Sequence, residues 1–305
     1  MISVVIPHFN QPSQLADCLG SLVTQAAGGH ETEIIVVDNG SREMPAAVVA
    51  RFARVRLMHE PLSGPGPARN AGIAAAAGDI LAFIDADMVA APGWLEAIAA
   101  RFRDPAAQIL GGDVRILLRD PDRPTALECY EAEYSFRMEH YIARQGFTGT
   151  GNLAVRRAVL DDVGPFAGIG VAEDRDWGRR ATAKGYRILW APEMLALHPA
   201  RGSFAELARK WDRQTAHDFA YGVTGPKGRA RWIAKTLAMP LSPLAGIPRI
   251  LRSRRIPGGI AGRLKAFAVL ARIRLYRARL MAGLAFARNA GDMAGRWRDD
   301  AGGGG

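Results

Sequence analysis

Residues 80–87 read Ile-Leu-Ala-Phe-Ile-Asp-Ala-Asp, and this stretch decides the fold prediction. Five consecutive apolar residues are typical of a strand that is buried on both faces of a parallel sheet. The strand delivers two carboxylates, Asp85 and Asp87, at its carboxyl end, which is where ligands bind in open α/β sheets. The pair could share a divalent cation and a nucleotide, or it could simply form a solvated turn.

The sequence on both sides of this stretch alternates between strand and helix patterns. Strands are predicted at 2–7, 33–37, 55–58, 108–118, 147–155 and 186–190. Helices are predicted from about 13 to 27 and at 45–53, 68–77, 92–102, 125–145, 158–163, 173–184 and 203–220. This alternation predicts an α/β fold with a mostly parallel sheet and flanking helices.

Three further polar positions could carry chemistry. Asp38 ends the predicted strand 33–37, where it could accept the N–H of a nucleobase or close an Asx-turn. Glu173 and Asp174 open a helix, where a carboxylate could take the proton of an attacking hydroxyl or only favour the helix dipole. His198 follows an apolar strand, so it could complete a carboxylate metal site or make an ordinary backbone hydrogen bond.

Taken in order, these positions and their surroundings closely resemble the family 2 glycosyltransferases, which have a GT-A fold. The matching motifs are Val4-Val5-Ile6-Pro7-x-Phe9-Asn10, Val36-Val37-Asp38-Asn39-Gly40-Ser41, Ala68-Arg69-Asn70-x-Gly72, Gly78-Asp79 with the strand that ends in Asp85-x-Asp87, Gly151-Asn152, and Glu173-Asp174 with Arg180 and Gly185-Tyr186. The resemblance covers about residues 1–215. Asn39 departs from it, because an acidic residue is common at that position.

The resemblance implies a nucleoside-diphosphate sugar as donor, a UDP-sugar in the first place and a GDP- or dTDP-sugar as alternatives. It also implies Mg²⁺ or Mn²⁺ as cofactor. The donor-binding residues that it implies are Pro7, Phe9, Asn10, Asp38, Arg69, Asp85 and Asn152. The metal ligands that it implies are Asp87 and His198, with Asp85 beside them.

For catalysis, the resemblance implies that Asp174 is the base and that Glu173 positions Asp174 or the acceptor. Trp177 replaces an aliphatic residue, and it would either border the acceptor or serve packing. A single displacement would invert the anomeric centre, because no second carboxylate is suited to act as a nucleophile. The expected acceptor is the hydroxyl of a glycan or a lipid-linked molecule, in glycan, polysaccharide or glycolipid synthesis.

Two other functions compete with this one. The first is a non-catalytic protein that binds a sugar nucleotide or a carbohydrate on the same fold, since a fold does not fix a function. The presence of Asp85, Asp87, Asp174 and His198 together argues against it. The second is a nucleotidyltransferase, which would need a Gly-rich basic loop after the first strand. Residues 7–12 contain no Gly, Lys or Arg.

The charge is divided unevenly along the 305 residues. Residues 225–305 hold 17 Lys/Arg and 3 Asp/Glu, a net charge of +14, and the other residues carry a net charge of −4. We therefore expect a GT-A domain at 1–224 and a basic, partly helical extension at 225–305, with a linker or irregular surface segment at 240–260 and a helix at 261–288. The extension could attach to an anionic membrane, or it could pack on the body or in an oligomer. Only phosphate attraction supports nucleic-acid binding, and without a recognised nucleic-acid module no nucleic-acid partner is expected.

Two cysteines, Cys18 and Cys129, cannot form a disulfide framework or a zinc cluster. No segment has the pattern of a signal peptide or of a membrane-spanning helix. The expected location is therefore the cytoplasm, with peripheral attachment at the inner face of the cell membrane.

Overall fold

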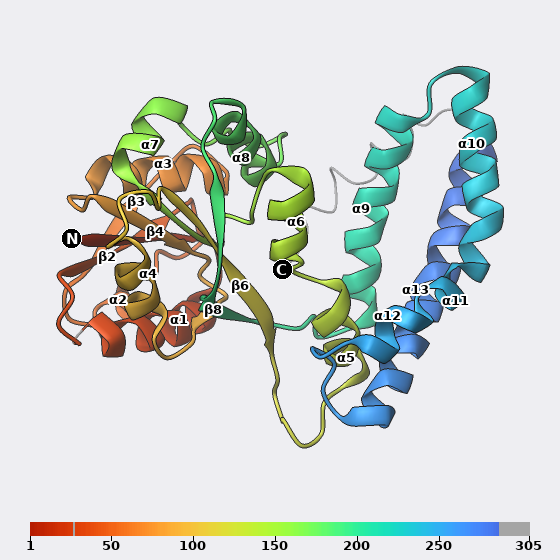
Figure 1. Cartoon of the computed structure of the whole chain (residues 1–305), viewed down its shortest axis with the longest axis horizontal. Helices are drawn as coiled ribbons and strands as arrows, with labels where there is room; N and C mark the ends of the chain where they lie inside the picture. The colour runs from red at the N-terminus through yellow and green to blue at the C-terminus, as the bar shows by residue number, and fades with distance from the viewer. Residues whose placement is uncertain (27, 287–305) are drawn as a thin grey trace. The chain divides into compact units, whose positions relative to one another are not determined.

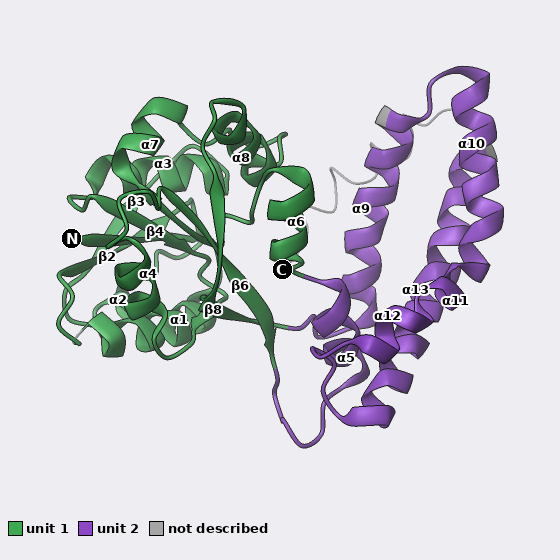
Figure 2. Cartoon of the chain, in the orientation of Figure 1, with its two compact units in different colours: residues 1–117, 136–199 green, residues 118–135, 200–305 purple. Residues whose placement is uncertain are grey.

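The computed structural model describes residues 1–26 and 28–286, which divide into two compact units (Figure 2). The first unit comprises residues 1–117 and 136–199, and the second comprises residues 118–135 together with the chain from residue 200 onward. The sequence places a domain boundary at 224/225 instead. That boundary, between the GT-A domain and the basic extension, stays a prediction, and the division into units describes which residues pack together.

An eight-stranded sheet in the order β3-β2-β1-β4-β7-β6-β8-β5 forms the centre of the first unit (Figure 1). The strands are β1 (Ile2–His8), β2 (Thr32–Asp38), β3 (Val55–His59), β4 (Ile80–Ile84), β5 (Val89–Ala90), β6 (Ile109–Leu117), β7 (Asn152–Arg156) and β8 (Ile188–Pro199). The neighbours from β3 to β4 are parallel, as are β6 and β8, while β7 is antiparallel to both of its neighbours and β5 is antiparallel to β8. The sheet is therefore mixed.

Helices cover both faces of this sheet. They are α1 (Pro12–Ala26), α2 (Ala46–Val49), α3 (Pro65–Ala75), α4 (Trp94–Arg101), α6 (Met138–Gln145), α7 (Arg157–Val163) and α8 (Glu173–Ala183). Figure 1 shows α1, α2 and α4 on one face and α3, α7 and α8 on the other. Successive strand residues point to opposite faces, so Val4 packs with α1 while Val5 belongs to the core under α3. Burial on both faces explains the unbroken apolar run at 80–84.

The second unit is helical. Its helices are α5 (Ala126–Tyr134), α9 (Phe204–Gly222), α10 (Gly225–Ala238), the 3₁₀ turn η1 (Met239–Leu241), α11 (Ser242–Ala245), α12 (Ile247–Arg252) and α13 (Gly259–Phe286). Residues of α5, α9, α12 and α13 share one core, which contains Tyr130, Leu207, Ile250 and Leu270. One side of the basic C-terminal helix is thus occupied by packing within its own unit.

Two sequence-based boundaries differ from the structure. The helix predicted at 125–145 is broken between α5 and α6, where Phe136 has a φ of 48° that an α-helix cannot contain. The predicted linker at 240–260 is wrong, because most of it forms short helices that carry a proline at the first or second position. The predicted helix at 261–288 is observed as α13, and its last two residues lie outside the described residues.

No helix in the described part of the chain is long and apolar enough to cross a bilayer.

Candidate active site

A cavity of about 570 Å³ lies at the carboxyl ends of β1, β2 and β4 in the first unit. This is the position that the strand order of an open α/β sheet favours for a ligand. Six of the predicted site residues line the cavity: Pro7, Phe9, Arg69, Asp85, Asp87 and Glu173. The fold therefore brings these six residues together from four separate stretches of sequence.

Arg69 of α3 holds two carboxylates of this cavity together. Its Nη2 donates to Asp85 Oδ1 over 2.6 Å, and its Nη1 donates to Glu173 Oε1 over 2.9 Å. The guanidinium is almost completely buried, and its rigid fork fixes the end of β4 against the start of α8. Burial raises the pKa of Asp85, and the charge of Arg69 only partly offsets that rise.

Asp87 and His198 form a second polar pair. His198 Nε2 lies 3.3 Å from Asp87 Oδ2, and His198 Nδ1 donates to the carbonyl oxygen of Pro199 over 2.6 Å. Burial works against an imidazolium, yet the hydrogen bond with Asp87 raises the pKa of His198. The same contact outweighs burial at the carboxylate and lowers the pKa of Asp87.

The orientation of His198 suits a metal ligand. A ligating histidine commonly donates its other ring N–H to a backbone carbonyl, and here the Nδ1 proton is used in this way while Nε2 faces a carboxylate. Within residues 1–26 and 28–286, no cluster of three or more His, Cys, Asp or Glu side chains forms a complete metal site. Magnesium sites with one or two protein ligands complete their shell with phosphates and water, so a two-residue pair fits such a cation.

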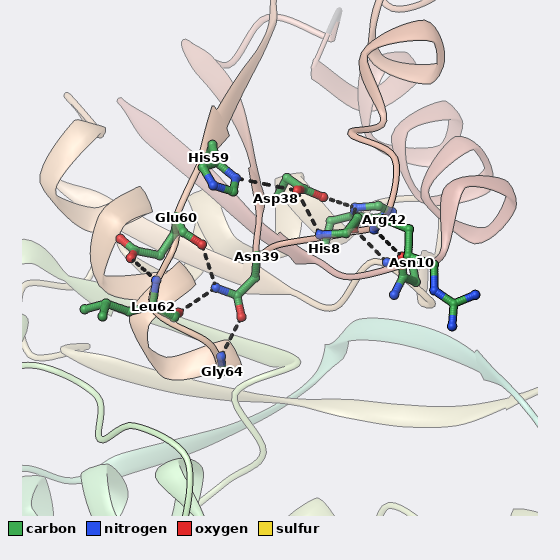
Figure 3. A network of polar contacts seen from close by, with 10 residues as sticks. His8, Asn10, Asp38, Asn39, Arg42, His59, Glu60, Leu62 and Gly64 are labelled. Carbon is green, nitrogen blue, oxygen red and sulfur yellow. Dashed lines mark hydrogen bonds and ion pairs between the residues drawn. The ribbon is translucent and has the colours of Figure 1, made fainter. Parts of the chain in front are cut away.

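Asp38 is buried and does not line the cavity. β1 and β2 pair in parallel with His8 opposite Asp38, and His8 Nδ1 lies 2.9 Å from Asp38 Oδ1 (Figure 3). The backbone N–H of Gln11 donates to His8 Nε2, so that nitrogen is an acceptor and the imidazole is the neutral Nδ1–H tautomer. Burial opposes ionisation of Asp38, but the contacts with Ser41 and His8 lower its pKa.

The sequence interpretation missed His8 and Gln11, which line the cavity where Asp38 was expected. Gln11 Nε2 also lies 3.5 Å from Asp87 Oδ2, so the loop after β1 connects the end of β2 to the end of β4. Pairing β1 with β2 in register from the sequence would have placed His8 beside Asp38. The contact of Asp38 with a nucleobase stays a prediction, and it would require His8 or Ser41 to release the carboxylate.

Asn39, which replaces a commonly acidic residue, holds the loop before α3. Its Nδ2 donates to the carbonyl oxygens of Glu60 and Leu62, and its Oδ1 accepts from the Gly64 N–H (Figure 3). Only an amide can donate to two carbonyls and accept from an N–H with one side chain. The departure at this position therefore has a structural reason, since Gly64 and Asn39 both line the cavity.

Asn10 also serves the backbone. It has a φ of 53°, and its Oδ1 accepts from the N–H of Arg42 (Figure 3). Its own N–H donates to Ser41 Oγ. Asn10 thus ties the loop after β1 to the turn after β2, and it does not line the cavity.

Two predicted site residues are core residues in the structure. Asn152 is fully buried and does not line the cavity. Its side chain donates to the carbonyls of Asp113 and Met194 and accepts from the indole N–H of Trp94, so it ties β7 to β6, β8 and α4. Trp177 is buried against Phe166, and its indole N–H donates to a backbone carbonyl. Burial of Trp177 supports the packing explanation, and its acceptor-side role stays a prediction.

Gly151, directly before Asn152, is the residue of the Gly-Asn motif that lies against the site. A Cβ at this position would lie 2.3 Å from Asp85 Oδ2, so a side chain here would displace that carboxylate. The glycine therefore leaves room for the carboxylate that Arg69 holds.

Asp174 lies beside the cavity-lining Glu173 in the first turn of α8 but does not line the cavity itself. Its Oδ1 accepts from the N–H of Arg175. Burial, together with the charge of Glu173, raises the pKa of Asp174. A carboxylate with a raised pKa is a stronger base than an ordinary aspartate.

Comparisons with known proteins agree with this geometry. The model of the family described as "Glycosyl transferase family 2" matches residues 3–164. Glycosyltransferase AglE of Haloferax volcanii is 33% identical over 215 residues, which cover 68% of this chain and 70% of the relative.

Solved structures show the same fold. A mannosyltransferase of Pyrobaculum calidifontis, in complex with GDP-Man and Mn²⁺, aligns with a TM-score of 0.59 at 18% identity and covers 94% of this chain and 88% of that one. TarS of S. aureus (residues 1–349), in complex with UDP-GlcNAc, aligns with a TM-score of 0.52 at 16% identity, with 91% of each chain covered. From the family match and the relative together, the chain belongs to glycosyl transferase family 2.

Proposed function

We propose that the cavity binds a nucleoside-diphosphate sugar and that the enzyme transfers the sugar, with inversion, to an acceptor hydroxyl. The observation that carries this proposal is the bridge from Asp85 through Arg69 to Glu173, which joins the end of β4 to the start of α8 at one cavity. Each carboxylate among the described lining residues is engaged by Arg69 or His198. We assign these carboxylates to the cation and to the geometry of the site, which leaves none of them for a second displacement, so we propose a single displacement.

The nucleotide end of the donor would lie near Pro7 and Phe9. The Phe9 ring is 56% exposed at the cavity and is available for stacking on a base. The solved relatives carry GDP-Man and UDP-GlcNAc, which supports a nucleotide-sugar donor of this class. We propose a UDP-sugar first, and a GDP- or dTDP-sugar as the alternatives, with a glycan or lipid-linked hydroxyl as acceptor.

Asp87 and His198 would hold Mg²⁺ or Mn²⁺. When bound there, the cation would neutralise charge on the leaving diphosphate. Asp85 is the third predicted ligand, but its Oδ1 is taken by Arg69, so we assign it to the ribose or base side. Arg69 keeps this carboxylate in place and adds positive charge beside the diphosphate.

Asp174 would accept the proton of the attacking hydroxyl. The acceptor approaches opposite to the leaving group, so a base on that side need not line the diphosphate part of the cavity. Glu173 is tied to Arg69 and would position Asp174 and the acceptor.

The test is a screen of the full chain with a panel of nucleotide sugars, measuring release of nucleoside diphosphate with and without Mn²⁺. Asp174→Asn should keep donor binding and lose about 10²–10⁴-fold in turnover, because it removes basicity with little change in shape. Glu173→Gln is the matched control. If it alone abolishes turnover, the base is Glu173, and donor binding with no turnover by the unmodified chain would favour the non-catalytic alternative.

We also propose that the enzyme works as a peripheral protein at an anionic membrane on the cytoplasmic side. Among the described residues, nine of the fourteen exposed large apolar side chains lie between Ile233 and Leu275, within the basic part of the chain. Exposed leucines among basic residues favour shallow insertion combined with attraction to anionic lipid.

The membrane proposal is tested by co-sedimentation with vesicles of rising anionic-lipid content. Leu237→Ser combined with Leu241→Ser should reduce sedimentation, and added salt should reduce it further. Leu62→Ser removes an equally exposed leucine from the first unit and should have no effect. Equal sedimentation of all three proteins would reject the attachment role.

A further inference from the structure

The second unit contains a cavity of about 610 Å³ that plays no part in the sugar transfer proposed above. It is lined by residues of α9, α10 and α13, including Arg231, Lys235, Arg277, Thr215 and Trp232. Three basic side chains line it against one carboxylate, that of Asp218. The cavity therefore has a net positive charge.

Arg277 is the buried cation of this cavity. Only 9% of it is exposed, and its Nε is buried without a hydrogen-bond partner among the described residues. Its guanidinium lies 3.8 Å from the centre of the Trp211 ring, which stacks with the charge but does not neutralise it. Burial and the nearby Arg274 lower the pKa of Arg277 to about 10, so it remains charged at neutral pH.

The Asp218 carboxylate offsets only part of the cost of burying Arg277, because burial and Arg274 still lower the pKa of Arg277. A bound anion would remove the rest of that cost. No ion pair of Arg231, Lys235 or Arg277 is found in the part of the chain that the structure describes. Thr215 Oγ1, also in the lining, is buried and has no partner there either. Arg277 Nε and Thr215 Oγ1 thus lack hydrogen-bond partners among the described residues, and the exposed Arg231 and Lys235 add two positive charges to the same lining.

Other residues of the lining are apolar. Trp232 donates its indole N–H to the carbonyl of Met281, so its ring presents carbon atoms to the cavity. Met239 and Met281 are flexible, polarisable side chains that adapt to an alkyl chain. Cationic and apolar lining in one cavity fits a ligand that has an anionic head and a hydrocarbon tail.

We propose that this cavity binds the phosphate group of an anionic amphiphile. Arg277, Arg231 and Lys235 hold the phosphate, and Trp232, Met239 and Met281 contact the first part of its apolar chain. A phosphate monoester carries close to two negative charges and several acceptor oxygens, which suits several converging donors better than a carboxylate would. This site is independent of the donor cavity in the first unit.

Calorimetric titration of the full chain with dihexanoyl phosphatidic acid, kept below its micelle concentration, tests the proposal without a bilayer. Inorganic phosphate and dihexanoyl phosphatidylcholine are the comparison ligands. We expect saturable binding of the phosphatidic acid, weaker binding of phosphate, and little binding of the choline lipid. Arg277→Met should weaken binding about tenfold or more, since a charged hydrogen bond is lost.

Arg279→Met is the matched control, because Arg279 is an exposed residue of the same helix that does not line the cavity. The double variant Arg231→Gln/Lys235→Gln changes only exposed residues, so it protects the test against misfolding of the Arg277 variant. Donor binding in the first unit should be unchanged in all three. Equal affinity of inorganic phosphate would reject the amphiphile, and unaltered binding by both cavity variants would reject the site.

Discussion

Arg69 and Arg277 are the two buried arginines of the described chain, one in each unit. Arg69 donates to two carboxylates from separate elements. Arg277 has no carboxylate in hydrogen-bond contact and lies on a tryptophan ring. The same residue type thus fixes the geometry of one cavity and leaves the other with unneutralised charge.

The two cavities also differ in the sign of the charge that a ligand would have to supply. The cavity of the first unit is rich in carboxylates, so a cation would complete it, while the cavity of the second unit is rich in cations, so an anion would complete it. Removal of metal ions should therefore affect the cavity of the first unit, and removal of anions should affect the cavity of the second unit. The predictions below test this contrast, beginning with the largest expected effect.

Asp87→Ala should reduce turnover about 10³-fold or more, because the metal's contribution to transition-state stabilisation amounts to several kcal/mol. His198→Asn should be milder and partly rescued by excess Mn²⁺, since the carboxylate ligand Asp87 remains. The measurement is release of nucleoside diphosphate against metal concentration. A chelator should abolish turnover and leave phosphatidic acid binding in the second unit intact. Full activity of chelator-treated protein would remove the metal from the mechanism.

Arg69→Met and Arg277→Met should change the free energy of unfolding by different amounts. The first leaves Asp85 and Glu173 without a counter-charge, and we expect a loss of about 2–3 kcal/mol. This is below the loss for a fully buried pair because the Asp85 side chain is 35% exposed. The second removes no partner, and we expect a change within about 1 kcal/mol in either direction. Thermal unfolding measures the change in stability of both variants. Equal losses of stability would mean that the two arginines do not differ in this way.

Much of this organisation could be predicted from the sequence. The apolar run at 80–84 identifies a strand because burial on both faces leaves no polar position, and the run at 2–6 is interrupted only by Ser3. The acids at strand ends follow from that assignment, and Asp85 and Asp87 do line the cavity.

Side-chain direction could not be predicted. Asn152 and Trp177 occupy positions near the site in sequence, yet their functional groups bond to backbone carbonyls in the core. His8 and Asn39 were missed because their roles depend on partners across the sheet and in a distant loop. The short helices at 239–252 were mistaken for a linker because a proline in a first turn has the same composition signal as a proline in a loop.

Asn39→Asp should cost about 1–2 kcal/mol and raise the KM for the donor. A carboxylate cannot donate to the carbonyls of Glu60 and Leu62, and it would face both of them with negative charge. Asn10→Asp is the matched control, since the Asn10 side chain only accepts from the Arg42 N–H in a left-handed conformation that Asp tolerates. Equal effects of the two variants would show that the loop before α3 does not depend on Asn39.

The smallest expected effect concerns Asp174, whose pKa is raised in the folded protein chiefly by burial. Above that raised pKa the ionised carboxylate destabilises the fold, because the unfolded chain ionises more readily. Asp174→Asn should therefore raise the melting temperature slightly at neutral pH while it lowers turnover. The gain should vanish as the pH falls through the raised pKa, where the carboxyl becomes protonated and neutral like the amide.

Asp162 provides a comparison of opposite sign for this last prediction. Its contacts with Lys184 and Tyr186 lower its pKa, so its contribution to stability is present above the ordinary aspartate pKa and disappears as the pH falls through the lowered value. Asp162→Asn should lower the melting temperature at neutral pH and change little in acid. Melting curves of both variants from pH 7 downward should therefore approach the unmodified protein from opposite sides. Curves displaced in the same direction would mean that the carboxylate of Asp174 is compensated, and its assignment as a base held ready by burial would fail.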